Sequence, residues 1–438
     1  MSRSDRASSE AVLARLTTLH SRPVDLSLER MRRLCRQLGD PQDRLGPVVH
    51  VAGTNGKGST IAFLRAIAEA AGLRVHVYTS PHLVRFCERV RLAGSLISEE
   101  AFTDILERVE AINDGEPITQ FEATTAAAFL AFSETQADLS LIEVGLGGRF
   151  DATNVIERRA LSLITPVARD HCEFLGETLA EIAFEKAGII APGAPVISAA
   201  QDSMASAVIA DVAARKGAPL RMAGRDFRMQ ESSSGLVFTD EEACLDLPLP
   251  ALAGAHQIVN SGLAVAAARY LQLPAPAIAA GMSAAVWPAR LQRITSGPLA
   301  GRAQAAGGEL WLDGAHNPHA IATLLPAMDA LARRSGKPLC IILGLLASKD
   351  AAGILHHLRG LQPFDLIVTD FSAAAAAKAD SLAALAHAAG LTPRPAASLS
   401  EAVGLALDGQ GPAPVIIVCG SLYLAGELLS TAPGDAPA

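Results

Sequence analysis

Between residues 48 and 198 the sequence repeats one theme, in which a short apolar run ends in Gly, Ser or Asp and a helical stretch follows. This alternation is typical of βαβ units. Because the runs are almost entirely apolar, we expect parallel strands in one sheet that helices cover on both faces. The expected strands are Val48–Ala52, Val75–Thr79, Leu139–Val144, Leu161–Thr165 and Pro195–Ser198, and the expected helices are Ser59–Ala71, Glu99–Asn113 and Ala123–Glu134.

The rest of the chain divides at a polar, helix-breaking stretch, residues 295–298. Before it, residues 221–250 alternate in short segments, which predicts a small antiparallel β insert, and a helix is expected over Gln257–Leu271. After it, apolar runs again alternate with helices, which predicts a second, Rossmann-like α/β domain. We therefore expect an α/β protein with domains at residues 1–296 and 297–438, and a frayed tail from Ala432.

Composition restricts what such a fold binds. Half of the 438 residues are hydrophobic and 19% are charged, which provides material for two cores and argues against disorder. The formal net charge of −8 gives no general attraction to nucleic acid or to anionic membranes. No apolar run approaches the roughly 20 residues that span a bilayer, and no secretory signal is visible. We expect a cytoplasmic monomer whose six scattered cysteines are reduced and mostly buried.

The first expected strand runs into a glycine-rich turn, Gly53-Thr54-Asn55-Gly56-Lys57-Gly58-Ser59-Thr60, and then into a helix. Such a turn aims backbone N–H groups and a helix N-terminus at one point, where they favour a phosphate. The glycines permit close backbone approach, Lys57 can neutralise phosphate charge, and a hydroxyl of Ser59 or Thr60 can support Mg²⁺. The sequence predicts a P-loop ATPase-type first domain. The alternative is a turn that is rich in glycine for packing alone.

This loop departs from the standard P-loop pattern at two positions. Val51 stands where the first glycine is expected, and Gly58 separates the lysine from the hydroxyl residues. In this the loop resembles the P-loops of the Mur ligase superfamily. Eight further motifs cover nearly the whole chain and together resemble the bifunctional dihydrofolate synthase/folylpolyglutamate synthase family. They are Thr79-Ser80-Pro81-His82-Leu83, Phe121-Glu122-Ala123-Thr124, residues 143–154, Asp170-His171, Glu185–Ile189, His256–Asn260, Pro288–Gln292 and Asp313–Pro318.

The resemblance implies an ATP-dependent ligase that joins L-glutamate to dihydropteroate and to the glutamate tails of folates. A carboxylate is unreactive towards amines because it is anionic and resonance-stabilised. Such a ligase therefore transfers the γ-phosphoryl group of ATP to it, and the amine of glutamate attacks the resulting acyl phosphate. Because two anions approach each other in the first step, Lys57 and Mg²⁺, for which two sites are expected, must cancel charge.

By the same resemblance, the magnesium ligands are Ser80, Glu143 and His171. Oxygen ligands suit Mg²⁺, and Glu143 ends an apolar strand at the carboxyl edge of a parallel sheet, where α/β proteins place their ligands. A helix N-cap ahead of Pro81 is the alternative role for Ser80. Lys186 corresponds to a lysine that is carbamylated in similar ligases, so that a cation becomes an anion; the alternative is a solvated salt bridge. Together with Lys57, His171 and Arg290, Lys186 is expected to act in catalysis.

The remaining residues that the resemblance assigns bind nucleotide or substrate. Asn260, Arg290 and Asp313 are expected on the adenine side of ATP, and His316 and Ser421 near glutamate. Phe121 could stack on the flat pterin ring, although a buried core aromatic explains it equally well. The pterin-side residues are Asp25, Leu26, Ser27, Leu28, Phe121, Glu122, Ala123, Thr124, Phe150, Asp151 and Ala152.

Three other functions remain open at this point. An enzyme of the same family could extend folate glutamate tails without making dihydrofolate. A peptidoglycan Mur ligase would share the chemistry, but it carries a UDP-sugar-binding domain ahead of the P-loop, and only 52 residues precede Gly53. A P-loop switch that only hydrolyses nucleotide should show a guanine-reading NKxD segment, and the sequence contains none.

Overall fold

The computed structural model describes residues 8–20, 27–361, 363–409 and 411–437. The chain divides into two compact units, of which the first comprises Met1–Ala251 and Ile258–Val286 and the second Leu252–Gln257 and Trp287–Ala438. The second unit therefore begins its main segment at Trp287, ahead of the predicted boundary at residue 297. The chain passes between the two units three times.

The first unit is built on an eight-stranded sheet with the strand order β4-β3-β2-β5-β1-β6-β7-β8. Neighbouring strands pair in parallel along the series β2-β5-β1-β6-β7-β8, whereas β3 and β4 add an antiparallel edge beside β2. Every residue of β1 and β5 is buried, as the continuous apolar runs predict for strands covered on both faces. The strands are β1 Val48–Ala52, β2 Val75–Tyr78, β3 Val90–Leu92, β4 Ser95–Leu96, β5 Leu139–Glu143, β6 Leu161–Ile164, β7 Val196–Ser198 and β8 Leu220–Met222.

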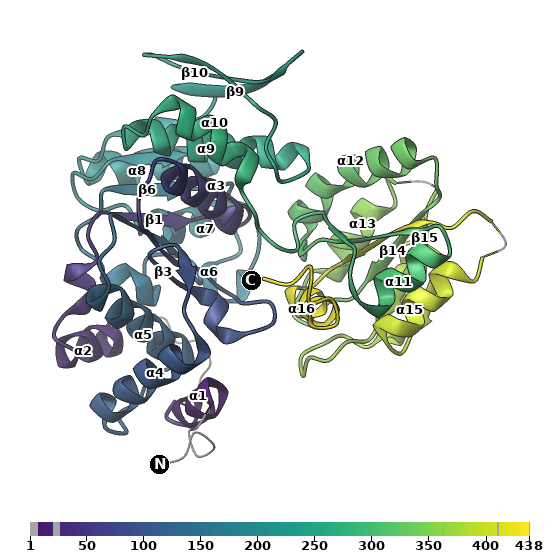
Figure 1. Cartoon of the computed structure of the whole chain (residues 1–438), viewed down its shortest axis with the longest axis horizontal. Coiled ribbons are helices and arrows are strands. Elements are labelled where there is room, and N and C mark those ends of the chain that lie inside the picture. Colours follow the sequence, from purple (N-terminus) through teal and green to yellow (C-terminus); the bar gives the residue numbers. More distant parts are fainter. Residues whose placement is uncertain (1–7, 21–26, 362, 410, 438) are drawn as a thin grey trace. The chain divides into compact units, whose positions relative to one another are not determined.

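Helices cover both faces of this sheet. Figure 1 shows α3, α9 and α10 together on one side and α1, α2, α4 and α5 gathered on the other. The second group forms one core with Val48, Tyr78 and Ile142 of the sheet. The helices are α1 Ser9–Thr17, α2 Glu29–Gln37, α3 Lys57–Ala70, α4 Glu99–Asn113, α5 Gln120–Glu134, α6 Cys172–Leu175, α7 Leu179–Ala187, α8 Ser203–Arg215, α9 Ala255–Tyr270 and α10 Ala275–Ala284, with 3₁₀ turns η2 Pro41–Arg44, η3 Phe86–Arg89 and η4 Ala152–Val155.

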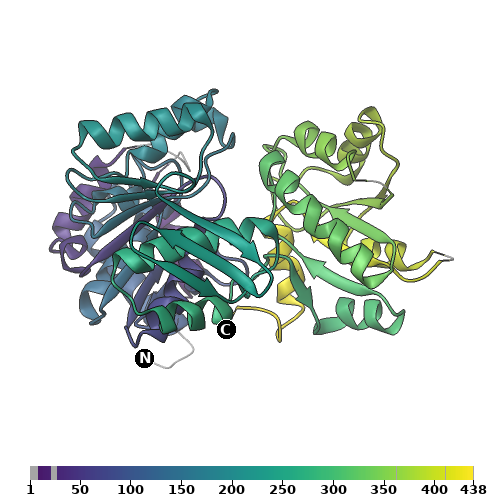
Figure 2. The same cartoon turned by 90° about the horizontal axis from the view of Figure 1, so that it is seen from above.

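The predicted antiparallel insert is a three-stranded sheet, β9 Phe227–Ser232, β10 Gly235–Asp240 and β11 Cys244–Leu247. Figure 2 shows its strands beside the helices that follow it. Met229 of β9 lies against α9, because a Cβ atom on Gly262 would come within 3.0 Å of the Met229 Cβ. Arg269 of α9 also donates to Asp240, at the end of β10, over 2.7 Å. The insert is thus fastened to the helix that carries Asn260.

The second unit holds a six-stranded sheet with the order β12-β13-β17-β14-β15-β16. All strands pair in parallel except β12, which runs antiparallel to β13. The predicted Rossmann-like α/β arrangement is confirmed, and in Figure 1 α12 and α13 lie on one side of the sheet and α11, α15 and α16 on the other. The elements are β12 Gln292–Ile294, β13 Glu309–Leu312, β14 Leu339–Leu343, β15 Asp365–Thr369, β16 Pro393–Ala396, β17 Val415–Cys419, α11 Gly297–Ala305, α12 Pro318–Ser335, α13 Ala351–Leu358, α14 Ala379–Ala388, α15 Leu399–Leu407 and α16 Leu422–Ser430.

The C-terminal tail contradicts the expectation of a frayed end. The carboxylate of Asp435 accepts hydrogen bonds from the backbone N–H groups of Thr295 at 2.9 Å and Ser296 at 2.7 Å, and from both of their hydroxyls. Gln292 donates to the Asp435 carbonyl over 2.8 Å. The single residue Asp435 therefore holds the tail against the start of α11. No helix within the described residues is long and apolar enough to cross a membrane.

Candidate functional site

The glycine-rich loop joins β1 to α3 and packs tightly against its neighbours. Gly53 has φ +146° and Gly56 φ +89°, conformations that side chains disfavour. A Cβ atom on Gly53 would lie 1.9 Å from the Thr165 hydroxyl, and one on Gly56 would lie 2.2 Å from the Asn260 Oδ1 atom. The loop therefore tolerates only glycine at these two positions, and Asn260, which is 4% exposed, touches it directly.

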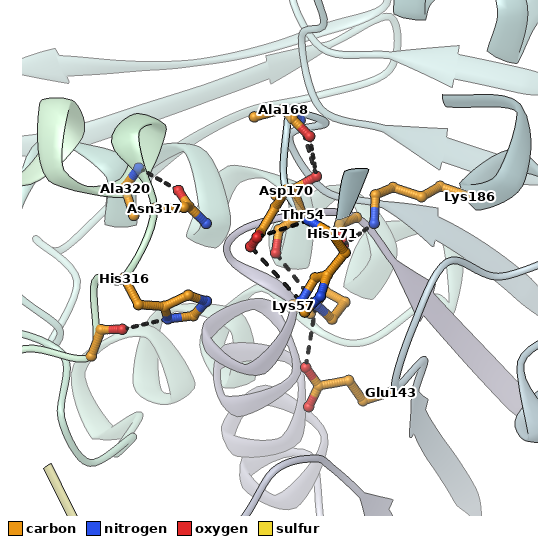
Figure 3. Close-up of polar contacts among 12 residues, drawn as sticks. Thr54, Lys57, Glu143, Ala168, Asp170, His171, Lys186, His316, Asn317 and Ala320 are labelled. Atoms are coloured by element: carbon orange, nitrogen blue, oxygen red, sulfur yellow. Dashed lines mark hydrogen bonds and ion pairs between the residues drawn. The ribbon is translucent and has the colours of Figure 1, made fainter. Parts of the chain in front are cut away.

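The segment after β6 fixes the loop from the other side. The Thr54 N–H donates to the Pro166 carbonyl over 3.0 Å. The Thr54 hydroxyl donates to the Ala168 carbonyl over 2.9 Å and accepts from the Ala168 N–H at 3.0 Å. Figure 3 shows this pairing. Because the Thr54 hydroxyl is already engaged, we expect Thr54 to shape the loop rather than to bind phosphate with its side chain.

Two hydroxyls at the start of α3 are left without partners. Ser59 is 1% exposed and Thr60 fully buried, and within the described residues neither hydroxyl makes a hydrogen bond. Buried polar atoms are normally satisfied, so an oxygen-rich ligand or a hard cation suits this position. Glu143 supplies a carboxylate to the same region, and the hydroxyl and carboxylate oxygens fit Mg²⁺.

Two lysine amines converge on one carbonyl oxygen of the loop. Lys57 Nζ donates to the Gly53 carbonyl over 3.3 Å, and Lys186 Nζ, from α7, donates to the same oxygen over 3.0 Å. Figure 3 shows the Lys186 amine pointing towards Lys57. Burial, with the charge of Lys57 second, lowers the pKa of Lys186 to about 7. The solvated salt bridge considered for Lys186 is therefore wrong, because its side chain is buried inside the unit.

The predicted metal residues Ser80 and Glu143 meet at the carboxyl edge of the sheet. Glu143, the last residue of β5, accepts from the Ser80 N–H at 3.2 Å and has its other oxygen 3.9 Å from Lys57 Nζ. His171 adopts φ +53° at the start of α6, with its Nε2 atom 4.0 Å from the Asp170 carboxylate. No three His, Cys, Asp or Glu side chains gather as a metal site within the described ranges, so the set of Ser80, Glu143 and His171 stays a prediction.

The segment after β5 is organised around Asp151. One carboxylate oxygen accepts from the N–H groups of Gly145 at 3.0 Å and Leu146 at 2.9 Å, and the other accepts from the N–H and hydroxyl of Thr153. Burial raises the pKa of Asp151, and these four hydrogen bonds oppose the rise. Asp151 therefore shapes the loop. Its neighbours differ, because Ala152 is buried whereas Phe150 is partly exposed under the Arg149 guanidinium, 4.3 Å from the ring centre.

The other predicted pterin-side residues surround the start of α5. The ring of Phe121 packs on Gly145, where a Cβ atom would come within 2.4 Å of it. Glu122 completes a capping box with Thr119 and pairs with Arg30 of α2 at 3.1 Å, yet its buried Oε1 atom has no partner among the described residues. Ala123 and Thr124 are buried, and Ser27 and Leu28 precede α2. Asp25 and Leu26 lie outside the described residues.

In the second unit, the predicted nucleotide residues flank the end of β13. The two carboxylate oxygens of Asp313 accept from the N–H groups of Leu291 and Ala315, both at 2.8 Å. Arg290 donates to the Ala289 carbonyl over 2.8 Å and lies against Gly314, where a Cβ atom would come within 2.8 Å of its guanidinium. Asp313 thus holds the turn that presents Arg290.

The predicted glutamate residues lie at the same edge of the second sheet. His316 follows β13 and shares a hydrogen bond of 2.8 Å with the Gly314 carbonyl, drawn in Figure 3. Ser421 follows β17, is 3% exposed, and caps α16 by accepting from the Tyr423 N–H at 3.1 Å. β13 and β17 are neighbours in the sheet, so both residues stand where parallel sheets place ligands.

Comparison with known proteins identifies the family of the chain. The Mur ligase middle domain model matches residues 51–268, and the model of the dihydrofolate synthetase C-terminal domain matches residues 301–431. The dihydrofolate synthase/folylpolyglutamate synthase of Escherichia coli is 38% identical over 351 residues, which are 80% of this chain and 79% of that protein. The chain belongs to the dihydrofolate synthase/folylpolyglutamate synthase family.

Solved structures of this family resemble the chain over nearly its whole length. E. coli FolC in complex with DHPP and ADP superposes with a TM-score of 0.87 at 33% identity and covers 98% of both chains. The bifunctional folylpolyglutamate synthase/dihydrofolate synthase of Yersinia pestis, complexed with AMPPNP and Mn ion, has a TM-score of 0.85 at 33% identity, covering 97% of this chain and 98% of that one.

Family motifs did not identify several residues that hold the site together. Thr165, Pro166 and Ala168 support the P-loop, and their only signal in the sequence is a position at the end of an apolar strand or just after it. Asp170 belongs to a family motif that implies no role for it, although its charge counteracts the lowering of the Lys186 pKa. Such residues act through contacts and charges between segments that are distant in sequence, which the spacing of a family motif does not reveal.

Proposed function

We propose that this chain is an ATP-dependent ligase that joins L-glutamate to dihydropteroate, forming dihydrofolate, and also extends the glutamate tails of folates. The observation that carries the proposal is the convergence of the Lys57 and Lys186 amines on the Gly53 carbonyl. Two lysines on one oxygen, beside two unpartnered buried hydroxyls, make a site for anions. The family relatives whose names or bound ligands include dihydrofolate synthase, ADP and DHPP support this choice of substrates.

The residues of the first unit fit the phosphoryl-transfer step. Lys57 and the N–H groups at the start of α3 would hold the ATP phosphates, and Ser59 or Thr60 with Glu143 and Ser80 would hold Mg²⁺. Magnesium supplies charge neutralisation when bound. The substrate carboxylate takes the γ-phosphoryl group and ADP leaves. The glutamate amine then attacks the acyl carbon, the C–O bond to phosphate breaks, and amide, phosphate and a proton are released.

We propose that Lys186 is carbamylated. An amine with a pKa of about 7 is substantially neutral at neutral pH, and the neutral amine is the form that attacks CO2. The product is an anion, which relieves the repulsion between two lysines on one oxygen and can support a magnesium ion. Mass spectrometry of the intact protein should find a labile adduct of CO2. A wild-type protein without such an adduct, and a Lys186→Ala variant of undiminished activity, would sink this part of the proposal.

The residues of the second unit are proposed to bind glutamate, through His316 and Ser421, and the nucleotide, through Arg290 and Asp313. Their position at the carboxyl ends of β13 and β17 supports this assignment. Arg290 is suited to the phosphates because a guanidinium offers a planar fork of donors. We also propose that the protein is a cytoplasmic monomer, for which its six unbridged cysteines and its net charge give support.

The deciding experiment supplies the purified protein with ATP, Mg²⁺ and L-glutamate, and offers dihydropteroate or a tetrahydrofolate in separate assays. Product formation with both acceptors, measured by mass, is the expected result. Turnover with a tetrahydrofolate alone would establish an enzyme that only extends tails. Turnover with neither would overturn the proposal, and glutamate-independent ATP hydrolysis would then favour a P-loop switch.

A further inference from the structure

Arg159 is a partly buried cation outside the predicted catalytic set. It lies between η4 and β6, and its Nε atom is sealed from solvent with no hydrogen-bond partner among the residues that the structure describes. Burial lowers the pKa of the guanidinium to about 10. In the described part of the chain, its hydrogen bonds go to three uncharged oxygens. They are the carbonyl of Ile189, the carbonyl of Ile156 at 2.6 Å and Asn154 Oδ1 at 2.7 Å.

These three oxygens belong to two segments that are distant in sequence and both reach the candidate site. Residues 154–156 end the loop that begins at Glu143, and Ile189 follows α7, which carries Lys186. Asn154 strengthens the junction by donating to the Arg149 carbonyl over 2.9 Å and the Gly188 carbonyl over 3.4 Å. Arg149 in turn donates its N–H to the Glu185 carbonyl over 2.8 Å.

A guanidinium is suited to this position for geometric reasons. Its planar fork meets several acceptors in fixed directions, which the single ammonium group of lysine cannot reproduce. A largely buried cation without a carboxylate costs free energy, so folding stability alone gives little reason for one here. The arrangement instead fixes the end of α7 relative to the segment from Glu143 to Ile156, and with it the place of the Lys186 amine.

We propose that Arg159 is a positioning residue for Lys186. By clamping the chain beyond α7 onto residues 154–156, Arg159 holds the Lys186 amine against the Gly53 carbonyl, where its carbamate is needed. The inference rests on the proposed carbamylation of Lys186. Arg159 itself touches neither the P-loop nor the predicted magnesium ligands in its hydrogen bonds.

Lys216 offers a matched control. Its amine, at the end of α8, donates to the carbonyl of Ile190, the residue next to Ile189, and it too is a cation with a pKa lowered by burial. It makes no hydrogen bond to residues 154–156. Lys216→Met should therefore remove a cation from the same chain end and leave the junction between the two segments intact.

The test compares the wild type, Arg159→Met, Arg159→Lys and Lys216→Met. Carbamate occupancy is measured by ¹³C NMR with labelled bicarbonate, and kcat is measured against bicarbonate concentration, both per folded protein. We expect Arg159→Met to lower kcat about 10- to 100-fold in ambient CO2, to need more bicarbonate for half-maximal activity, and to keep the KM for ATP within about twofold. Arg159→Lys should behave similarly, and Lys216→Met like the wild type.

Each other outcome has a definite meaning. Wild-type carbamate occupancy and kcat in both Arg159 variants would overturn the positioning role, as would an equal loss in Lys216→Met. If Arg159→Met does not fold, Arg159→Lys decides alone, because it keeps the charge and loses the fork. A wild-type protein without carbamate refutes the Lys186 hypothesis instead, independently of any effect at Arg159.

Discussion

The two units present similar sheet edges that treat their polar residues in opposite ways. At the carboxyl edge of the first sheet, the buried hydroxyls of Ser59 and Thr60 have no partner in the described part of the chain, and two lysines share one carbonyl. At the corresponding edge of the second sheet, the side chains of Asp313 and Ser421 accept hydrogen bonds from nearby backbone N–H groups.

The difference separates two ways of building a ligand site on a parallel sheet. The first edge keeps unfavourable features, since unpartnered hydroxyls and adjacent cations cost free energy unless an anion or metal binds. The second edge uses its polar side chains to hold turns in shape. We infer that binding energy for phosphates is concentrated in the first unit, whereas the second provides rigid, preformed contacts. The following predictions would break or sharpen this contrast, from the largest expected effect to the smallest.

Lys57→Ala should lower kcat by about 10³-fold, because it removes the positive charge that two approaching anions require. Thermal unfolding should change little in comparison, since among the described residues the hydrogen bonds of the Lys57 amine go to carbonyls of its own loop, and the amine lies 3.9 Å from Glu143. Steady-state kinetics with saturating ATP and a melting curve test both parts. Activity within tenfold of the wild type would show that the first edge does not concentrate the charge chemistry.

Lys186→Met should abolish activity and yet stabilise the fold, most strongly at low pH. The pKa of Lys186 is about 7 in the fold and about 10.5 in the unfolded chain, so the unfolded chain binds the additional proton between these values. Wild-type stability therefore rises as the pH increases through this window, and the full penalty applies below pH 7.

We expect Lys186→Met to exceed the wild type by on the order of 3 kcal/mol at pH 6.5, and by much less at pH 10. Urea unfolding followed by far-UV circular dichroism, in buffers free of CO2, measures the difference at both pH values. An advantage that is equal at pH 6.5 and pH 10 would contradict the lowered pKa.

Ser59→Ala and Thr60→Val form a matched pair that identifies the hydroxyl used by the magnesium nucleotide. One of them should raise the magnesium concentration needed for half-maximal activity about 10- to 100-fold, and the other should behave like the wild type. Both hydroxyls lack partners, so neither change breaks an existing hydrogen bond in the described structure. Two variants that both match the wild type would remove the magnesium role of this helix start.

Ser421→Ala should destabilise the second unit by about 1 kcal/mol through loss of the α16 cap. Both tryptophans, Trp287 and Trp311, belong to this unit, so urea unfolding followed by tryptophan fluorescence reports on it selectively. The KM for glutamate is measured under conditions in which the variant is fully folded. If this KM rises, Ser421 contacts the ligand as well as the backbone, and the contrast between the two edges weakens.

Asp435→Asn should have the smallest effect, below about 1 kcal/mol because the carboxylate is partly exposed. Burial raises the pKa of Asp435, but its hydrogen bonds to Ser296 and Thr295 outweigh burial and lower it overall. Its stabilisation is therefore present above the unfolded pKa, near 4, and is lost as the pH falls through the folded value. Urea unfolding followed by tryptophan fluorescence should show a lower midpoint for the variant than for the wild type at neutral pH, and a smaller difference between the two at pH 3.

The sequence predicted what depends on local pattern. The strand at Val48–Ala52 and the glycine-rich turn follow from an apolar run and glycine spacing, and the structure confirms them. The short strands β3, β4, β12 and β16, at or near the edges of the sheets, were not predicted, because they have two to four residues and depend on pairing with their neighbours.

The site was predictable only where a motif carries a function. Glu143 and Ser80 meet because strands that are adjacent in the sheet end at one edge, which the alternation of strands and helices already suggests. The burial of Lys186 could not be predicted from the sequence, since an adjacent Glu and Lys on a helix normally face solvent. The clamp at Arg159 was not predictable either, because two of its three partners are backbone carbonyls, which any residue supplies.

The three passages of the chain between the units restrict how the protein can be dissected. The first unit is not one continuous stretch of gene, because residues 252–257 belong to the second unit while α10 and most of α9 return to the first. A fragment that stops at residue 251 would lack Asn260, and with it the contact to Gly56. Truncation, gene fission or exchange of modules between homologues should therefore succeed only with a junction near residue 286. Residues 252–257 should stay in the chain ahead of that junction.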